Sequence, residues 1–268
     1  MHDEYLDLRE PIVWSNNEEQ NAALKFFNAA FTAEESGLRQ AHQLADEVQA
    51  WDPDLAEVLR LYGREEGWHR DLVTRFLDYL GGGVQAMGRV TRAFYSLHAR
   101  AERMETIVLV NLMFETIGAT TYRMALRHVT QPAARQMLTI LTRDESFHVP
   151  LNVHFLRQIF ERDPEARDKV QPIFYLLFFS LLALPWASRR KAQAFDHISV
   201  ADLRRAYAEQ LASLFLNEPE LGLTPPLWVL RWLDIDPDEL IRKKSLAVSS
   251  VEAAEHAADR RHVEVTAL

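Results

Sequence analysis

The chain contains no cysteine among its 268 residues. This absence excludes disulfides, cysteine-ligated zinc, thiolate-bound iron–sulfur clusters and a cysteine nucleophile. Glycine and proline are scarce, at 9 and 11 residues, and long stretches contain neither, which favours helices over a turn-rich β fold.

A long apolar run and an excess of basic charge are missing as well. The longest apolar run, Ile173–Leu184, lies between two prolines and is shorter than the ~20 residues that span a bilayer. The N-terminus is acidic and shows no secretory signal. The formal net charge of −9 argues against nucleic-acid binding, because neutralising phosphates requires a basic face. We therefore expect a cytoplasmic protein with no stable membrane span and no nucleic-acid partner.

Apolar residues recur at helical spacing through four long segments. We expect helices over residues 18–50, 53–80, 98–129 and 132–162. Asp52-Pro53 is typical of a helix start, and Gly81-Gly82-Gly83 ends the second helix. Short links join the first helix to the second and the third to the fourth, whereas residues 84–97 form a longer crossover. The pattern predicts an all-α protein built on a four-helix bundle of two antiparallel hairpins.

The remaining residues read as further helices. Starts are predicted at Asp163-Pro164, Ser199, Thr224-Pro225-Pro226 and Asp236-Pro237. The polar, alanine-rich segment after Val251 is either a frayed helix or a disordered tail. We predict that residues 1–162 carry the bundle and a di-metal site. Residues 163–268 are expected to form a helical extension that packs on the bundle within the same domain.

Two short motifs carry the chemistry, EEGWH at residues 65–69 and DESFH at residues 144–148. Each places a glutamate and a histidine three residues apart, on one face of a helix. One such pair is weak evidence, because a solvated glutamate beside a satisfied histidine is the more frequent explanation. Here both pairs lie within apolar stripes, each on the second helix of a hairpin, and an acid precedes both.

Each preceding helix carries a glutamate in its own apolar stripe, Glu34 in the first helix and Glu115 in the third. Glu35 falls on the polar face instead. Gly37 lies three residues after Glu34, and Gly118 lies three residues after Glu115. A glycine inside a helix costs ~1 kcal/mol relative to alanine. The matched glycines therefore indicate a need for open space, for dioxygen or substrate, beside the acids.

The negative charge of the predicted buried glutamates is the physical argument for bound metal. Four glutamates directed into an apolar core would destabilise the fold strongly if they were unpaired. Two divalent cations would neutralise them, and carboxylate-rich sites with a few imidazoles suit iron or manganese. The predicted ligands are Glu34, Glu66, His69, Glu115, Glu145 and His148. Asp144 is expected to accept the free ring N–H of His69. Glu65 is expected to do the same for His148.

These residues resemble those of the ferritin-like di-iron carboxylate superfamily. Its four-helix bundle places a glutamate on each of two helices and Glu-x-x-His on the other two. EEGWH and DESFH are similar to the acid-Glu-x-x-His forms of acyl-carrier-protein desaturases and bacterial multicomponent monooxygenases. The resemblance covers residues 18–160 and implies two iron ions on the six ligands, as Fe/Fe or alternatively Mn/Fe. It also implies dioxygen as co-substrate and an external electron donor such as ferredoxin or a flavin reductase.

Three functions remain open. The first is a di-iron oxygenase or oxidase, monomeric or homodimeric, that acts on a small or carrier-bound organic metabolite by hydroxylation, desaturation, N-oxygenation or oxidative cleavage. The residues beyond the bundle are sufficient to wall a substrate cavity, and Tyr62, Asn111 and Tyr122 are its expected lining. The second function is metal handling, as a ferroxidase or peroxide scavenger. The third is a metal-free helical interaction scaffold.

Overall fold

The computed structural model describes residues 6–86, 102–188 and 192–242, and within these ranges the regular elements are all helical. The first hairpin consists of α1 (Asn17–Val48) and α2 (Pro53–Tyr79), and the second of α4 (Met104–His128) and α5 (Pro132–Arg162). The later elements are α6 (Pro164–Ser188), α7 (Gln193–Asp196), α8 (Val200–Asn217), a short 3₁₀ turn (Pro219–Leu221), α9 (Leu227–Trp232) and α10 (Pro237–Arg242).

Three of the four long helices have nearly the predicted bounds, but α4 begins at Met104 instead of residue 98. Arg103, which precedes it, is extended and offers no side-chain cap. The buried face of α4 begins at Glu105 and Ile107, and the two described residues before the helix, Glu102 and Arg103, are exposed. Most of the expected crossover, residues 98–101 and the segment after Val251 lie outside the described residues.

Polar side chains fix where several helices begin. Asn16, Asp52 and Ser199 each accept a hydrogen bond from the backbone N–H three residues later, at 2.9, 2.9 and 3.0 Å. Such caps satisfy N–H groups that lack a partner in the first helical turn. The predicted starts at Asp163-Pro164 and Asp236-Pro237 coincide with the first residues of α6 and α10.

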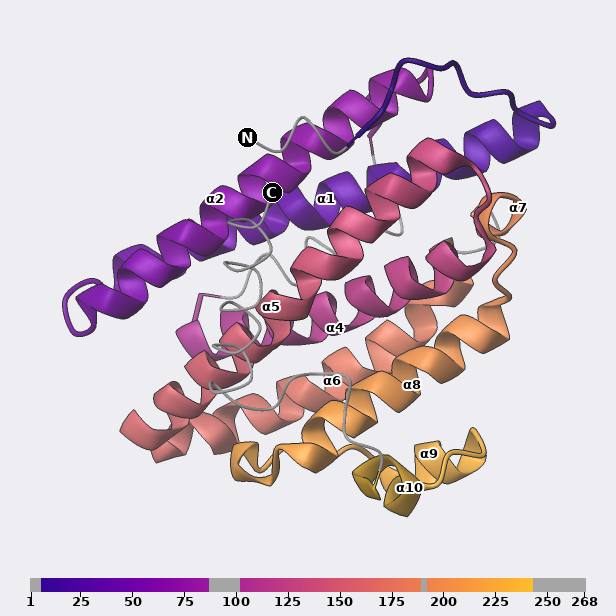
Figure 1. Ribbon diagram of the computed structural model, residues 1–268. Helices are drawn as coiled ribbons and strands as arrows, with labels where there is room; N and C mark the ends of the chain where they lie inside the picture. The colour runs from indigo at the N-terminus through magenta and orange to yellow at the C-terminus, as the bar shows by residue number, and fades with distance from the viewer. Residues whose placement is uncertain (1–5, 87–101, 189–191, 243–268) are drawn as a thin grey trace.

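Figure 1 shows the long helices as successive pairs, α1 with α2, then α4 with α5, then α6 with α8. In the two hairpins of the bundle α1 packs mainly on α2, and α4 packs mainly on α5. Helices α6 and α8 pack against each other and against α4, while α7 lies against α1. An all-α fold with a four-helix bundle and additional C-terminal helices is thereby confirmed. The domain division at residue 162 stays a prediction.

One hydrophobic core continues from the bundle into the C-terminal helices. The Phe27 ring lies 4.7 Å from that of Phe76 and 5.8 Å from that of Phe195, which belongs to α7. Between α6 and α8 the rings of Phe174 and Phe215 are 4.7 Å apart. All five side chains are buried. The C-terminal helices therefore share their apolar interior with the bundle.

The helix α6 differs from the others in composition. Among the described residues it is the one helix long and apolar enough to cross a membrane by length and composition, over Pro164–Trp186. One face, with Phe174 and Phe178, is fully buried against the protein, whereas Leu176 and Trp186 are exposed. In this fold α6 is packed against α4, α5 and α8.

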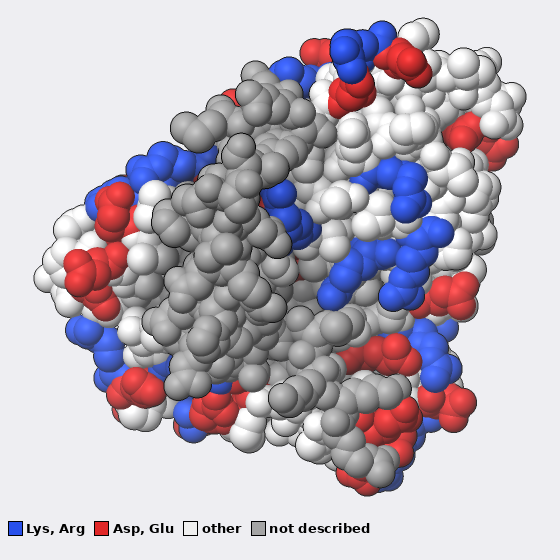
Figure 2. All heavy atoms as spheres, in the orientation of Figure 1, with Lys and Arg blue, Asp and Glu red and all other residues white. Residues whose placement is uncertain are grey.

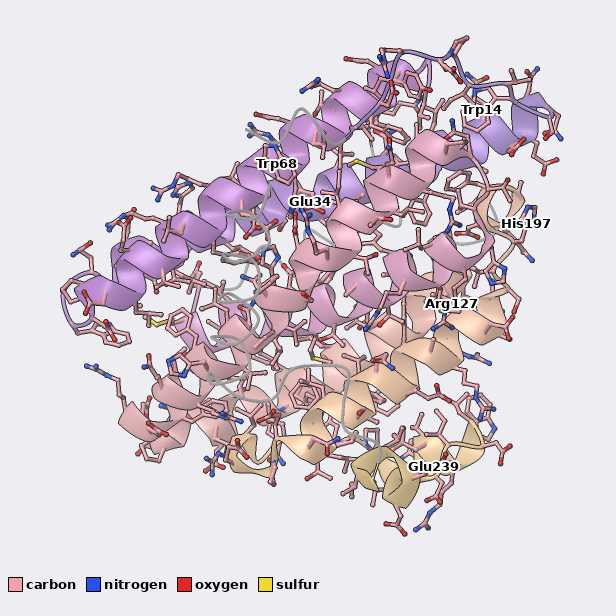
Figure 3. The ribbon with its side chains drawn as sticks, in the orientation of Figure 1. Trp14, Glu34, Trp68, Arg127, His197 and Glu239 are labelled. Carbon is pink, nitrogen blue, oxygen red and sulfur yellow. The ribbon has the colours of Figure 1, made fainter. Side chains whose placement is uncertain are left out.

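The surface departs locally from the acidity of the whole chain. Figure 2 shows Lys and Arg side chains gathered on one face over α4 and α8, in the region where Figure 3 labels Arg127. Arg123, Arg127 and Arg205 line a surface cleft of about 310 Å³ there. Arg205 is paired with Glu209 at 3.1 Å. The lining of this cleft includes neither of the histidine motifs.

Candidate metal centre

Six acidic and imidazole side chains converge between the two hairpins, at the place where Figure 3 labels Glu34. They are Glu34 on α1, Glu66 and His69 on α2, Glu115 on α4, and Glu145 and His148 on α5. Five of them have relative exposures between 0 and 3%. The Glu115 side chain is 12% exposed and so is the most accessible of the six. Glu35, beside Glu34, lies outside the cluster and is half-exposed.

The six residues fall into two groups, each able to hold one ion. One group is Glu34, His69 and Glu145, and the other is Glu66, Glu115 and His148. Within each group the candidate ligand atoms all lie within 4.8 Å of one another. Each group takes residues from both hairpins. The cluster therefore forms only when α1–α2 and α4–α5 pack face to face.

Both histidines turn the same ring nitrogen toward the carboxylates. The Nδ1 atom of His69 lies 3.3 Å from Glu34 Oε2. The Nδ1 atom of His148 lies 3.1 Å from both Glu66 Oε1 and Glu145 Oε2. An ion in either group would therefore bind Nδ1, which leaves Nε2 to carry the proton.

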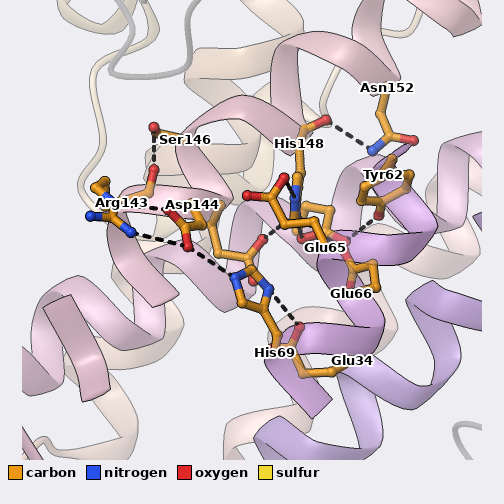
Figure 4. A network of polar contacts seen from close by, with 12 residues as sticks. Glu34, Tyr62, Glu65, Glu66, His69, Arg143, Asp144, Ser146, His148 and Asn152 are labelled. Atoms are coloured by element: carbon orange, nitrogen blue, oxygen red, sulfur yellow. Dashed lines mark hydrogen bonds and ion pairs between the residues drawn. The ribbon is translucent and has the colours of Figure 1, made fainter. Parts of the chain in front are cut away.

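The Nε2 atoms face the two acids that precede the motif glutamates (Figure 4). His69 Nε2 lies 3.1 Å from Asp144 Oδ2, and His148 Nε2 lies 3.4 Å from Glu65 Oε2. These are the two contacts expected from the sequence. Each acid comes from the hairpin opposite its histidine, so each contact also ties the hairpins together. Such partners fix the tautomer and the orientation of a metal-binding ring.

Burial and mutual repulsion shift the acid–base properties of the cluster. Burial raises the pKa of Glu66 and Glu145 well above the usual range, and the charge of Glu115 adds to both effects. Burial lowers the pKa of His69, but the nearby carboxylates of Asp144 and Glu34 outweigh it and raise this pKa to about 9. Without an ion, the cluster thus limits its net charge by retaining protons. A cation that displaced them would leave the ligands in the form that metal binding requires.

Three buried polar atoms of the cluster, namely Glu34 Oε2, Glu66 Oε1 and His69 Nδ1, have close ion-pair contacts but no hydrogen bond of good geometry. A buried polar atom without a partner costs about 1–3 kcal/mol. All three are lone-pair donors of the kind that cations bind, and they belong to the two groups described above. The carboxylate-rich, sulfur-free set fits iron or manganese. The residues present therefore fit a pair of metal ions.

Two tyrosines hold carboxylates in place. The Tyr62 hydroxyl donates to Glu115 Oε1 at 2.8 Å, and the Tyr122 hydroxyl donates to Glu34 Oε1 at 3.2 Å. Each bond runs between the two hairpins. Burial raises the pKa of Tyr62 well above its usual value, and Glu115 and Glu66 raise it further, so the hydroxyl keeps its proton. Both tyrosines were expected as pocket lining, and both are hydrogen-bonded to predicted ligands.

A cavity of about 40 Å³, called here the inner chamber, lies between α1 and α4 beside the cluster. Glu115 and Glu145 form part of its wall, as do Asn111 and Tyr122. Tyr62 is not among its lining residues. The rest of the wall is mainly apolar or small: Ala33, Ser36, Gly37, Gln40, Val110, Phe114 and Gly118. Two of the candidate ligands are therefore reachable by a small molecule.

The matched glycines turn out to serve different purposes. A Cβ atom at Gly37 would lie 2.6 Å from Glu66 Oε2, so this position is small because a carboxylate occupies the space. A Cβ atom at Gly118 would meet no atom within 4 Å, although the residue lies in the middle of α4. The expectation of open space holds at Gly118, whereas at Gly37 the space is filled by Glu66.

Sequence reasoning missed two supporting residues. Arg143 Nε lies 2.8 Å from Asp144 Oδ1 and so fixes the acid that faces His69. Asn152 donates from its side-chain amide to the His148 carbonyl at 2.9 Å, close to Pro150, which lies inside α5. No helical spacing rule marks Arg143, because neighbours in sequence point to different faces. The N–H that Pro150 lacks would have reached the carbonyl of Ser146 and not that of His148, so it gave no signal for Asn152.

No family model matches the sequence, and no curated protein matches it. A comparison with solved structures finds similarity to "Protein 19 with aldehyde deformylating oxidase activity from Synechococcus". The TM-score is 0.60 and the identity 18%, and the match covers 87% of this chain and 100% of that chain. The chain has a ferritin-like fold.

The ferritin-like fold confirms the architecture that the two motifs implied. At 18% identity the match concerns the arrangement of helices and not the chemistry. The metal centre is therefore inferred from this chain's own carboxylates and imidazoles, which the fold brings together in two groups.

Proposed function

We propose that this ferritin-like protein is a non-haem di-iron oxygenase or oxidase that uses dioxygen to oxidise an organic substrate. The observation that carries the proposal is the inner chamber, which reaches Glu115 and Glu145. A purely structural metal site is closed, whereas a catalytic site keeps a position open for the reactant. The aldehyde deformylating oxidase activity of the similar Synechococcus protein supports oxidase chemistry and makes aldehydes the first substrate class to test.

The proposed cofactor is a pair of iron ions, with Mn/Fe as the alternative. One ion would be held by Glu34, His69 and Glu145. The other would be held by Glu66, Glu115 and His148. When bound, the ions would supply the electrons and open coordination positions for the reduction of dioxygen.

The protein's own groups hold the ligands and keep water out. Asp144 and Glu65 keep the proton of each histidine on Nε2, so that Nδ1 stays free to bind an ion. Tyr62 occupies one oxygen of Glu115 and leaves Oε2 facing the cluster. Apolar side chains of α4 in the chamber wall exclude water from the reacting groups.

The partners follow from the proposed chemistry. They are dioxygen, a small or carrier-bound organic substrate, and an external electron donor such as ferredoxin or a flavin reductase. The protein itself is still predicted to be a cytoplasmic monomer or homodimer. Light scattering coupled to gel filtration measures the mass, and a large cage would favour iron storage instead.

The test combines metal content with oxygen consumption. Protein loaded anaerobically with ferrous iron should bind about two ions per chain, as the two ligand groups imply. It should consume dioxygen faster when an aliphatic aldehyde and a reductant are added. Glu115→Ala should lose one of the ions and the aldehyde-dependent oxygen uptake. Glu35→Ala is the matched control, because Glu35 lies beside a ligand but outside the cluster.

Each remaining outcome rules against the proposal in a recognisable way. Oxygen uptake that depends only on ferrous iron and yields ferric iron would identify a ferroxidase. Protein purified without chelator that holds no stoichiometric iron, manganese or zinc, and takes up none, would identify a metal-free scaffold. A Glu115→Ala protein with full metal content and activity would remove the metal assignment itself.

A further inference from the structure

A second cavity adjoins the inner chamber on the side of the C-terminal helices. This outer chamber has a volume of about 140 Å³. Its wall comes from α1, α4, α6 and α8, and also includes Ala192 beside α7. The two chambers share the lining residues Ala33, Phe114, Gly118 and Tyr122. They are therefore neighbouring compartments that meet along one short stretch of α1 and α4.

Gly118 is the shared residue that leaves space between the chambers. The other three shared residues carry side chains, whereas a Cβ atom at Gly118 would meet nothing within 4 Å. A glycine inside a helix lowers stability relative to alanine, and no neighbour packs into the space to compensate. Gly118 thus adds nothing to the packing of the fold, and it leaves open space at a position that lines both chambers.

The sizes of the chambers indicate what each can hold. One water needs ~10–15 Å³, and an apolar cavity of ~150 Å³ accommodates benzene. The inner chamber, at about 40 Å³, accommodates dioxygen or a single functional group. The outer chamber, at about 140 Å³, accommodates a body of roughly six carbons.

The lining of the outer chamber indicates the chemistry of that body. Most of it is apolar, with Phe26, Ala30 and Ile117 among the lining residues. The polar side chains of its wall are the exposed Lys25, Tyr122, and the Thr121–Tyr207 pair, whose hydroxyls lie 2.6 Å apart and bond to each other. An apolar body therefore matches this wall better than a charged one.

We propose that Gly118 is the specificity-determining residue of the site, and that the substrate is an apolar molecule lying across both chambers. Its body occupies the outer chamber, and its reactive group passes over Gly118 to reach Glu115 and Glu145. This proposal rests on the proposed function for the identity of the reacting group. The passage itself is a property of the cavities and is testable without turnover.

The first experiment uses xenon as a probe, because xenon occupies apolar cavities whether or not the protein is active. Crystals of the metal-loaded full chain under xenon pressure should show one site in each chamber. Gly118→Leu should remove the density over residue 118 and in the inner chamber while the outer site stays. Ala30→Leu, which fills the outer chamber instead, should give the converse pattern. Xenon in both chambers of Gly118→Leu at unchanged occupancy would overturn the proposal.

The second experiment uses aldehydes of two lengths. The ratio of kcat/KM for octanal to that for acetaldehyde should fall by about ten-fold or more in Gly118→Leu, since one methylene in a pocket is worth about 10–200-fold. Gly118→Ala should fold at least as well as the natural chain and should lower the ratio by a few-fold. This variant keeps the test valid if Gly118→Leu does not fold. Gly67→Ala is the control, because its Cβ would make only ordinary contacts with Leu38. An unchanged ratio in both Gly118 variants would refute the specificity role.

The two experiments separate failure of this proposal from failure of the proposed function. If neither aldehyde is turned over but the xenon pattern changes as described, the passage stands and the substrate class is wrong. If aldehydes are turned over but neither variant alters the ratio or the xenon pattern, the function stands and Gly118 is not the determinant.

Discussion

The two hairpins of the bundle carry the same ligand pattern but support it differently. In the first hairpin Glu34 is 1% exposed, and the space at Gly37 is filled by Glu66. In the second hairpin the Glu115 side chain is 12% exposed, and the space at Gly118 is open. Both hairpins line the inner chamber, but the candidate ligands in its wall, Glu115 and Glu145, belong to the second hairpin. Equal spacing in sequence does not make two halves of a site equivalent.

The two acids that face the histidines also differ in their burial. His69 faces Asp144, whose side chain is 2% exposed and is also bonded to Arg143. His148 faces Glu65, whose side chain is 31% exposed and whose contact is longer, at 3.4 Å. A hydrogen bond to a charged group is worth more when it is buried and well fixed. The ring of His69 is therefore the more rigidly held of the two.

The largest test of this difference is alanine at each matched glycine. Gly37→Ala brings a Cβ to 2.6 Å from Glu66 Oε2, so the carboxylate must move. We expect a loss of about 1–3 kcal/mol of stability, typical of overpacking, together with weaker iron binding. Gly118→Ala meets no atom and should gain up to ~1 kcal/mol from helix propensity. Thermal unfolding and iron titration of both variants check the prediction. A loss of stability in both variants, or a gain in both, would contradict the difference between the two hairpins.

The metal-free protein should become less stable as the pH rises. The pKa of His69 is about 9 in the folded chain against an ordinary value of 6.5, so its stabilising contribution is fully present below pH 6.5. It is lost as the pH rises through about 9, by roughly 3 kcal/mol at most. The raised pKa values of His148, Glu66 and Glu145 act in the same direction.

Thermal melts of chelator-treated protein between about pH 6 and pH 9.5 measure this effect. The iron-loaded protein should show the opposite trend over the lower part of the range, because metal binding strengthens as the ligands lose protons. Asp144→Asn should flatten the metal-free curve, since Asp144 is a main cause of the raised pKa of His69. Metal-free stability that rose with pH across this range would contradict the assignment of the buried cluster.

The acids behind the two histidines should matter unequally. Asp144→Asn should weaken iron binding by about 10–100-fold, as loss of a partner to a ligating histidine usually does. Glu65→Gln should weaken it less, because Glu65 is more exposed and its contact to His148 is longer. Competition with a calibrated chelator gives both affinities. Equal losses would show that burial of the partner acid does not set its influence.

The smallest expected effect concerns the two tyrosines. Tyr62→Phe removes the donor 2.8 Å from Glu115, and Tyr122→Phe removes the donor 3.2 Å from Glu34. Each loss should cost on the order of 1 kcal/mol, with the shorter bond of Tyr62 contributing more. Denaturant titration of the iron-loaded variants measures the difference. A larger loss at Tyr122 would mean that the first hairpin depends more on its hydrogen bonds than on its packing.

Much of the architecture could be predicted because the responsible forces are local. Apolar periodicity placed α1, α2 and α5 within about two residues at each end, since a two-faced helix needs only neighbouring residues to define its buried side. The same periodicity separated Glu34 from Glu35. The start of α4 was misplaced because Glu102 and Arg103, the described residues before it, are exposed and offer no apolar face.

The amino-acid sequence by itself determined which residues can serve the centre: two Glu-x-x-His motifs, two striped glutamates and the acids preceding the motifs. Only the tertiary structure decided how they combine, because grouping depends on which helices face each other. It paired His69 with Glu34 and Glu145 across two hairpins. It also gave the matched glycines opposite environments, since the space around a helix is defined by neighbours distant in sequence. Gly37 accommodates a ligand, and Gly118 leaves an opening.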